Sequence, residues 1–70
     1  ETPEQVVAIA DLLARLADRQ PRWMRVVDAR YFGGMTATET ARLLDVSERT
    51  VRRDWRDARA WLAQELGVER

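Results

Sequence analysis

Arginine side chains gather in the C-terminal third of the sequence, where they could recognise a polyanion. Every one of the 12 basic residues of the chain is an arginine. A guanidinium group can donate two parallel hydrogen bonds to a phosphate or to the O6 and N7 atoms of guanine. The arginines between residues 42 and 59 are Arg42, Arg49, Arg52, Arg53, Arg56 and Arg59. This stretch is therefore a candidate nucleic-acid-binding region.

The overall charge is neutral, which weighs against that interpretation. The 12 basic residues are balanced by 12 acidic ones, whereas nucleic-acid-binding domains usually carry a basic excess. A GC-rich genome also favours arginine codons, and a solvated helix face with pairs such as Arg53 with Asp57 would look similar. Asp54 and Asp57 lie close to the predicted binding face. They could repel phosphates or hold the arginines in place, and the sequence leaves both roles open.

The composition argues against disulfide bonds, metal sites and catalytic residues. The chain has no cysteine and no histidine, which removes disulfides, most zinc sites, thiol nucleophiles and imidazole bases. Gly33-Gly34 is not a phosphate-binding loop, because no Lys-Ser or Lys-Thr follows it. We expect no enzymatic activity, no catalytic residue, no cofactor, no metal and no small-molecule substrate.

Length and hydropathy bound the organisation of the chain. Seventy residues form at most one domain, so residues 1–70 are predicted to be a single domain. No stretch resembles a membrane span or a secretory signal, so we expect a cytoplasmic protein without membrane contact. The chain starts at Glu1 rather than at a methionine, and we expect it to be a piece of a longer protein.

Helical periodicity indicates the elements that position the arginines. Thr2-Pro3 and Gln5 form a capping box at the start of a first helix that runs to about Arg19. Its predicted apolar stripe consists of Val6, Ile9, Leu13 and Leu16, with Leu12 beside them. Pro21 begins a second helix, and Gly33-Gly34 ends it, because glycine accepts the left-handed conformation of a C-terminal cap. The second helix contains Trp23, Val26, Val27, Arg30 and Tyr31.

Two further helices follow, joined by a short turn. Thr36 and Glu39 form a second capping box, and Asp45-Val46-Ser47 is the predicted turn. Ser47 then caps a fourth helix, which Gly67 ends. The predicted apolar face of that helix consists of Val51, Trp55, Ala58, Leu62 and Leu66. The expected fold is all-α, a four-helix domain with a C-terminal helix-turn-helix at about residues 36–66, and no β pattern appears.

The spacing within this segment favours a helix-turn-helix over a chance pair of helices. Ala41 is the small residue expected where the two helices cross, and Val46 and Val51 are the apolar residues that flank the turn. With the apolar face buried, the outward side of the last helix can enter the major groove. The candidate base-reading residues on that side are Arg49, Arg52, Arg53 and Arg56. Ser47 and Thr50, beside free amides at the helix N-terminus, could hold a phosphate.

The tryptophans and methionines are interpreted mainly as core residues. Trp55 falls on the buried face, so base stacking is the weaker interpretation for it. Trp61 lies off that stripe and could pack on the first helix or mark a partner surface. Met24 and Met35 are expected to fill gaps in the core.

Several motifs of the chain resemble a known family of transcription proteins. They are the stretches Tyr31-Phe32-Gly33-Gly34-Met35-Thr36, residues 39–47, Thr50-Val51-Arg52-Arg53-Asp54-Trp55 and Ala58-Arg59-Ala60-Trp61-Leu62. Together they resemble region 4, the C-terminal helix-turn-helix domain of bacterial sigma-70 family sigma factors, within the extracytoplasmic-function (ECF) group. The resemblance covers about residues 21–66, and the first helix fits by position and pattern only.

The resemblance implies a role in transcription initiation. Region 4 of such factors binds the minus-35 element of promoter DNA, docks on the β flap of the RNA polymerase core, and can be occluded by an anti-sigma factor. By position, the four arginines named above would read bases, and Arg42, Ser47, Thr50 and Arg59 would contact the DNA backbone. Asp45 stands where many relatives have glycine, but aspartate tolerates the left-handed conformation better than most residues.

Two alternative functions stay open at this point. One is the helix-turn-helix output domain of a response regulator, which shares the spaced pattern of a capping Thr36, Glu39 and Ala41, followed by Val46-Ser47 and Thr50-Val51. The other is a sigma-like protein-interaction module that has lost DNA reading, which the neutral net charge would suit.

Overall fold

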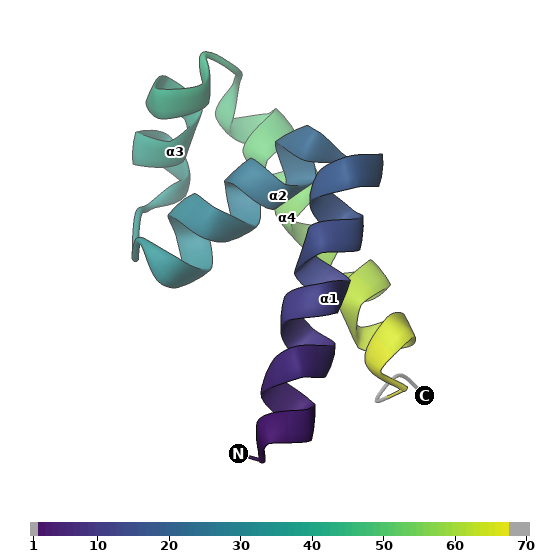
Figure 1. Ribbon diagram of the computed structural model, residues 1–70. Coiled ribbons are helices and arrows are strands. Elements are labelled where there is room, and N and C mark those ends of the chain that lie inside the picture. The colour runs from purple at the N-terminus through teal and green to yellow at the C-terminus, as the bar shows by residue number, and fades with distance from the viewer. Residues whose placement is uncertain (1, 68–70) are drawn as a thin grey trace.

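Four α-helices and one π-helical turn make up the protein in this computed structural model, which describes residues 2–67 (Figure 1). The elements are α1 (Pro3–Arg19), α2 (Pro21–Val27), η1 (Asp28–Phe32), α3 (Ala37–Leu44) and α4 (Glu48–Leu66). Helix α2 packs against both α1 and α4, and α3 packs against α4. No strand occurs within residues 2–67, so the all-α prediction is confirmed. No helix of this part of the chain is long and apolar enough to cross a membrane.

Side-chain caps fix the N-termini of three helices where the sequence predicts them. The Thr2 hydroxyl accepts from Gln5 N at 3.1 Å, and the Gln5 side chain accepts from Thr2 N at 3.0 Å. The same reciprocal pair joins Thr36 and Glu39 before α3, at 3.0 and 2.8 Å. Ser47 caps α4 by accepting from the backbone N–H three residues later at 3.0 Å. Each cap satisfies amides that have no partner within the helix, and so sets where the helix begins.

The sequence predicts one regular helix from Pro21 to Gly33-Gly34, but the structure divides this segment into two elements. Its α-helical part ends at Val27, and the chain continues as the π-helical turn η1, which Gly33 closes by donating to Asp28 O at 2.8 Å. Of these two glycines, Gly34 is the one in the left-handed conformation, with φ +65°. Gly33 has an ordinary φ, but a Cβ there would lie 2.8 Å from Ala29 O. The two glycines are therefore required for different reasons, one for close approach and one for backbone conformation.

The core consists of two small clusters on either side of α2. Leu16, Val27 and Ala58 form the first, with Trp23, Met24, Trp61 and Leu62 packed against it. Val26, Ala41 and Val51 form the second and join α2, α3 and α4. Trp55 borders both clusters and is half-buried, which confirms its assignment to the core.

The predicted burial of the apolar stripes was wrong at the N-terminal end of α1 and at the C-terminal end of α4. Val6 and Ile9 are exposed, and so is Leu66, whereas Leu12 and Leu16 are buried. The reason is the length of α2, whose seven residues cannot cover all of the 17-residue α1. Periodicity identifies the apolar face of a helix but not how far its partner extends along it.

The crossing of α3 and α4 leads to a first testable prediction. Ala41 is buried between Val26 and Val51, so Ala41→Leu would force extra volume into a filled space. We expect it to lower the free energy of unfolding by about 1–3 kcal/mol in a denaturant titration. The matched control is Ala60→Leu on the exposed side of α4, which should change stability by less than about 0.5 kcal/mol. Equal stability of the two variants would contradict this packing of α3 on α4.

Candidate nucleic-acid interface

The outward side of α4 presents the arginines that the sequence singles out. Val51, Asp54 and Ala58 are the buried residues of α4, and they mark its inward side. The four predicted base-reading residues are all exposed and fall within an arc of about 100° on the other side at 3.6 residues per turn. They are Arg49, Arg52, Arg53 and Arg56, which together form the arginine face of α4. The structure thus brings the predicted set together on one accessible helix face.

The connection between α3 and α4 sets the direction in which this face points. Asp45 ends α3 in the left-handed conformation, with φ 58° and ψ 48°. Val46 N then donates to Ala41 O at 3.0 Å, which closes the turn before Ser47 caps α4. Aspartate therefore takes the conformation that glycine would allow at this position, as the sequence analysis expects.

Carboxylates hold three of the four arginines on this face. Arg52 Nη2 donates to Glu48 Oε1 at 2.8 Å, and Arg56 Nε donates to Asp57 Oδ1 at 3.1 Å. Arg53 Nε lies 3.8 Å from Asp54 Oδ1, so the pairing of Arg53 with Asp57 considered above is not the one observed. Among residues 2–67 no carboxylate lies within ion-pair distance of Arg49. The arginine face thus combines strong hydrogen-bond donors with local charge balance.

Asp54 is a buried carboxylate that ties α4 to α2. It is 1% exposed, and Arg22 donates to both of its oxygens, with Arg22 Nη2 and Asp54 Oδ1 3.3 Å apart. The hydrogen bond to Asp54, followed by the negative charge of that carboxylate, raises the pKa of Arg22 above its ordinary value. Asp54 therefore faces inward, and its carboxylate is not exposed on the arginine face. This pair was not predicted from the sequence, although the positions of Val51 and Ala58 on either side of Asp54 already implied the burial of Asp54.

The predicted backbone-contact residues flank the arginine face. Ser47 and Thr50 sit at the N-terminus of α4, with their hydroxyl oxygens 3.0 Å apart, and Arg42 is exposed on α3. Arg59 is exposed as well, one turn beyond Trp55. The contact of these four residues with DNA stays a prediction.

Two arginines share the ring of Trp55. The guanidinium carbon of Arg59 lies 5.6 Å from the ring centroid and that of Arg30 lies 5.5 Å from it. Arg30 also donates to Met35 O at 2.8 Å, so it links η1 to the chain that leads into α3. Cation–π contact of this kind orients a guanidinium group without neutralising it. Arg59 is therefore held beside α4 with its charge available.

A second surface, separate from the arginine face, is apolar. A groove of about 480 Å³ runs between α1, η1 and α4, and Arg59 is the only charged residue among those that line it. Tyr31 and Phe32 stand at its edge, 71% and 59% exposed, with their rings edge-to-face at a centroid distance of 5.1 Å. The groove is also lined by Ile9, Leu12, Leu13, Val27, Trp55, Leu62, Ala63 and Leu66. Large apolar side chains left open together typically mark a surface for a protein partner.

Trp61 is half-buried rather than part of an open surface. It packs against the cluster of Leu16, Val27 and Ala58, and the guanidinium of Arg15 in α1 lies 6.0 Å from its ring centroid. Arg15 also pairs with Glu65 at 3.4 Å, so this contact joins α1 to α4. Of the two roles considered for Trp61, packing near the first helix is the one observed.

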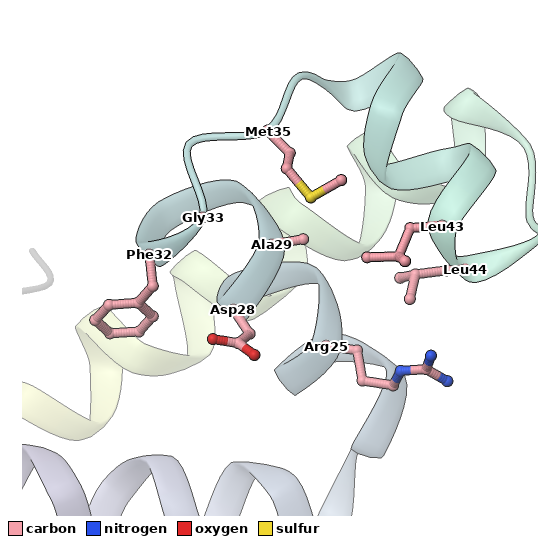
Figure 2. Close-up of a pocket in the computed structure, with 8 residues that line it drawn as sticks. All are labelled: Arg25, Asp28, Ala29, Phe32, Gly33, Met35, Leu43 and Leu44. Atoms are coloured by element: carbon pink, nitrogen blue, oxygen red, sulfur yellow. The ribbon is translucent and has the colours of Figure 1, made fainter.

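A second hollow, of about 510 Å³, lies between η1 and α3 (Figure 2). Met35 and the leucines of α3 face one another across it, while Phe32 and Arg25 extend away from its centre. Arg25 and Asp28 are the charged residues among those described as lining it.

Comparison with known proteins identifies a family for the chain. The family model described as ECF sigma factor matches residues 1–68 of the chain. No curated protein and no solved structure matches the chain. The match covers nearly the whole sequence, including the first helix, which resembled the family only by its position and pattern.

Proposed function

This chain belongs to the ECF sigma factor family, and from that premise we propose that α4 reads the minus-35 element of promoter DNA while the apolar groove docks on RNA polymerase. Sigma factors act in transcription initiation, with promoter DNA and RNA polymerase as their partners. They are transcription proteins rather than enzymes. The family match does not support the response-regulator alternative.

The observation that carries the DNA-reading proposal is the exposed arginine face of α4. In this proposal α3 and α4 form a helix-turn-helix, and α4 enters the major groove with its N-terminal half. Arg49, Arg52, Arg53 and Arg56 then lie where guanidinium groups can pair with the O6 and N7 atoms of guanine. The buried side of α4 is fixed by α2 and α3, which gives the arginine face a defined orientation.

The flanking residues supply contacts that position the domain on the duplex. Ser47 and Thr50 lie beside the free amides of the α4 N-terminus, where the helix dipole also favours a phosphate. Arg59 is already oriented by Trp55, and Arg42 extends the basic surface onto α3. Contacts of this type hold the register of a protein on DNA and carry no sequence information themselves.

The groove between α1, η1 and α4 is the surface we propose for the β flap of RNA polymerase. Its apolar lining and the exposed Tyr31–Phe32 pair suit a partner segment with an apolar face. Arg59 at the rim would favour an acidic residue on that segment. An anti-sigma factor that covers this groove would block docking and would also cover Arg59, while the four proposed base-reading arginines would stay exposed.

An NMR titration of the labelled domain tests both surfaces. With promoter-like duplexes at low salt, where phosphate binding is strongest, we expect the shifts to concentrate at residues 47–59. With a β-flap fragment, we expect the shifts to concentrate at Tyr31, Phe32 and Leu62. Absence of any DNA-dependent shift in α4 would refute the DNA-reading proposal.

Arg49 provides the cleanest single test of base reading, because no carboxylate of residues 2–67 pairs with it. We expect Arg49→Ala to weaken binding to the preferred site by about 1–3 kcal/mol and to relax the preference for guanine at one position. Arg25→Ala removes the same charge from α2 and is the matched control. An equal loss on every duplex sequence would instead identify Arg49 as a phosphate contact.

A protein-interaction module without DNA reading is the second candidate. The observation that favours it is the pairing of three arginines of α4 with carboxylates, which lowers the net charge offered to phosphates. In that case the β-flap fragment would shift the NMR signals of the residues that line the apolar groove, and no DNA duplex would shift the signals of α4. The same titration therefore separates the two functions.

A further inference from the structure

Glu48 occupies a position on α4 that the arginine pattern does not explain. It is the first residue of the helix, and its side chain is 41% exposed. Its two carboxylate oxygens have different partners: Oε1 accepts from Arg52 Nη2 at 2.8 Å, and Oε2 accepts from Thr38 Oγ1 at 2.9 Å. The carboxylate is thus fixed between α3 and the arginine face.

The proposed DNA-reading function rests on arginines, and on that basis we propose that Glu48 is a specificity-determining residue for promoter DNA. Its first effect is on Arg52. A free arginine side chain at the surface samples many rotamers, whereas Arg52 is held along the helix by a charge-assisted hydrogen bond. Arg52 therefore enters the major groove of the DNA in one orientation. If Arg52 turns to contact a phosphate instead, its hydrogen bond with Glu48 is lost.

The second effect of Glu48 comes from its own hydrogen-bonding chemistry. An ionised carboxylate accepts hydrogen bonds and cannot donate them. In the major groove, cytosine and adenine present an amino group, whereas guanine and thymine present only acceptor atoms, with a methyl group on thymine. A base next to the one that Arg52 contacts can therefore approach Glu48 favourably only when it carries an amino group. Glu48 thus selects cytosine or adenine at one position of the site.

Helix capping alone does not account for this arrangement. Ser47 already caps α4, and any acid in the first turn would favour the helix dipole without contacting Thr38 and Arg52. The bond from Thr38 fixes the carboxylate from a second helix. This positions Glu48 more rigidly than a solvated first-turn glutamate such as Glu4 in α1.

The test is selection of duplexes from a random library by the wild type and by Glu48→Gln. Glutamine keeps the shape of the side chain and can still accept from Thr38, but it can both donate and accept towards a base. We expect Glu48→Gln to reduce the preference for cytosine or adenine at one position by roughly tenfold, to weaken the preference at the base that Arg52 contacts, and to keep the preferences at the other positions. Its affinity for random duplex should rise severalfold, because one repulsive charge is gone. Glu4→Gln is the control with the same charge change in the first turn of α1.

The outcomes separate this inference from the function on which it rests. If the wild type selects a sequence and Glu48→Gln selects the same one with equal preferences at every position, the inference is wrong and the DNA-reading proposal stands. A uniform loss of affinity on all duplexes with a lower melting temperature would also overturn it, because Glu48 would then be a structural residue. If the wild type selects no sequence at all, the DNA-reading proposal itself fails.

Discussion

Arg22→Ala is expected to lower the free energy of unfolding by about 2–3 kcal/mol, because it leaves the buried carboxylate of Asp54 without its main partner. Breaking a buried pair in this way usually costs more, but Arg53 lies 3.8 Å from Asp54 and compensates in part. For a domain of this size the melting temperature should fall by roughly 10–20 °C, as measured by circular dichroism.

The pair is asymmetric, and this asymmetry provides the control. Arg22 is 48% exposed and can be hydrated when it loses Asp54, whereas Asp54 cannot be hydrated when it loses Arg22. Asp54→Asn should therefore cost less than Arg22→Ala, and Asp54→Asn introduced into the Arg22→Ala variant should restore part of the lost stability. If the double variant were less stable than Arg22→Ala alone, the uncompensated charge could not be the cause of the loss.

Local signals in the sequence predict most of the helix boundaries. The capping boxes at Thr2 and Thr36, the serine cap at residue 47 and the left-handed Asp45 all depend on residues within three or four positions of one another. Interactions between residues this close in the chain can be predicted from the sequence alone. The exposure of the arginines on the outward side of α4 could be predicted for the same reason, since helical periodicity alone separates them from Val51 and Ala58.

Features that depend on how helices meet could not be predicted in the same way. The partner of Asp54 is 32 residues earlier in the chain, and nothing local identifies Arg22 among the other arginines. The exposure of Val6 and Ile9 depends on where α2 ends relative to α1. These are tertiary properties, which override local preference.

The two proposed surfaces share one tryptophan, so a change at Trp55 should affect both. Trp55 borders both core clusters, lines the apolar groove, and contacts Arg30 and Arg59 through its ring. We expect Trp55→Ala to lower the free energy of unfolding by about 2–4 kcal/mol, towards the lower part of the range for large aromatic residues because the ring is half-buried.

Trp55→Phe distinguishes the contribution of the aromatic face from that of volume. Phenylalanine keeps a ring for Arg30 and Arg59 to stack on, although a weaker one, and leaves a smaller cavity than alanine. We expect Trp55→Phe to retain most of the stability and the phosphate contact of Arg59, so the slope of DNA affinity against salt should match that of the wild type. Measured under conditions where both variants are folded, Trp55→Ala should give a slope shallower by about one phosphate contact. Identical slopes for the two variants would show that the stack with Trp55 does not position Arg59, and would leave Trp55 as a packing residue alone.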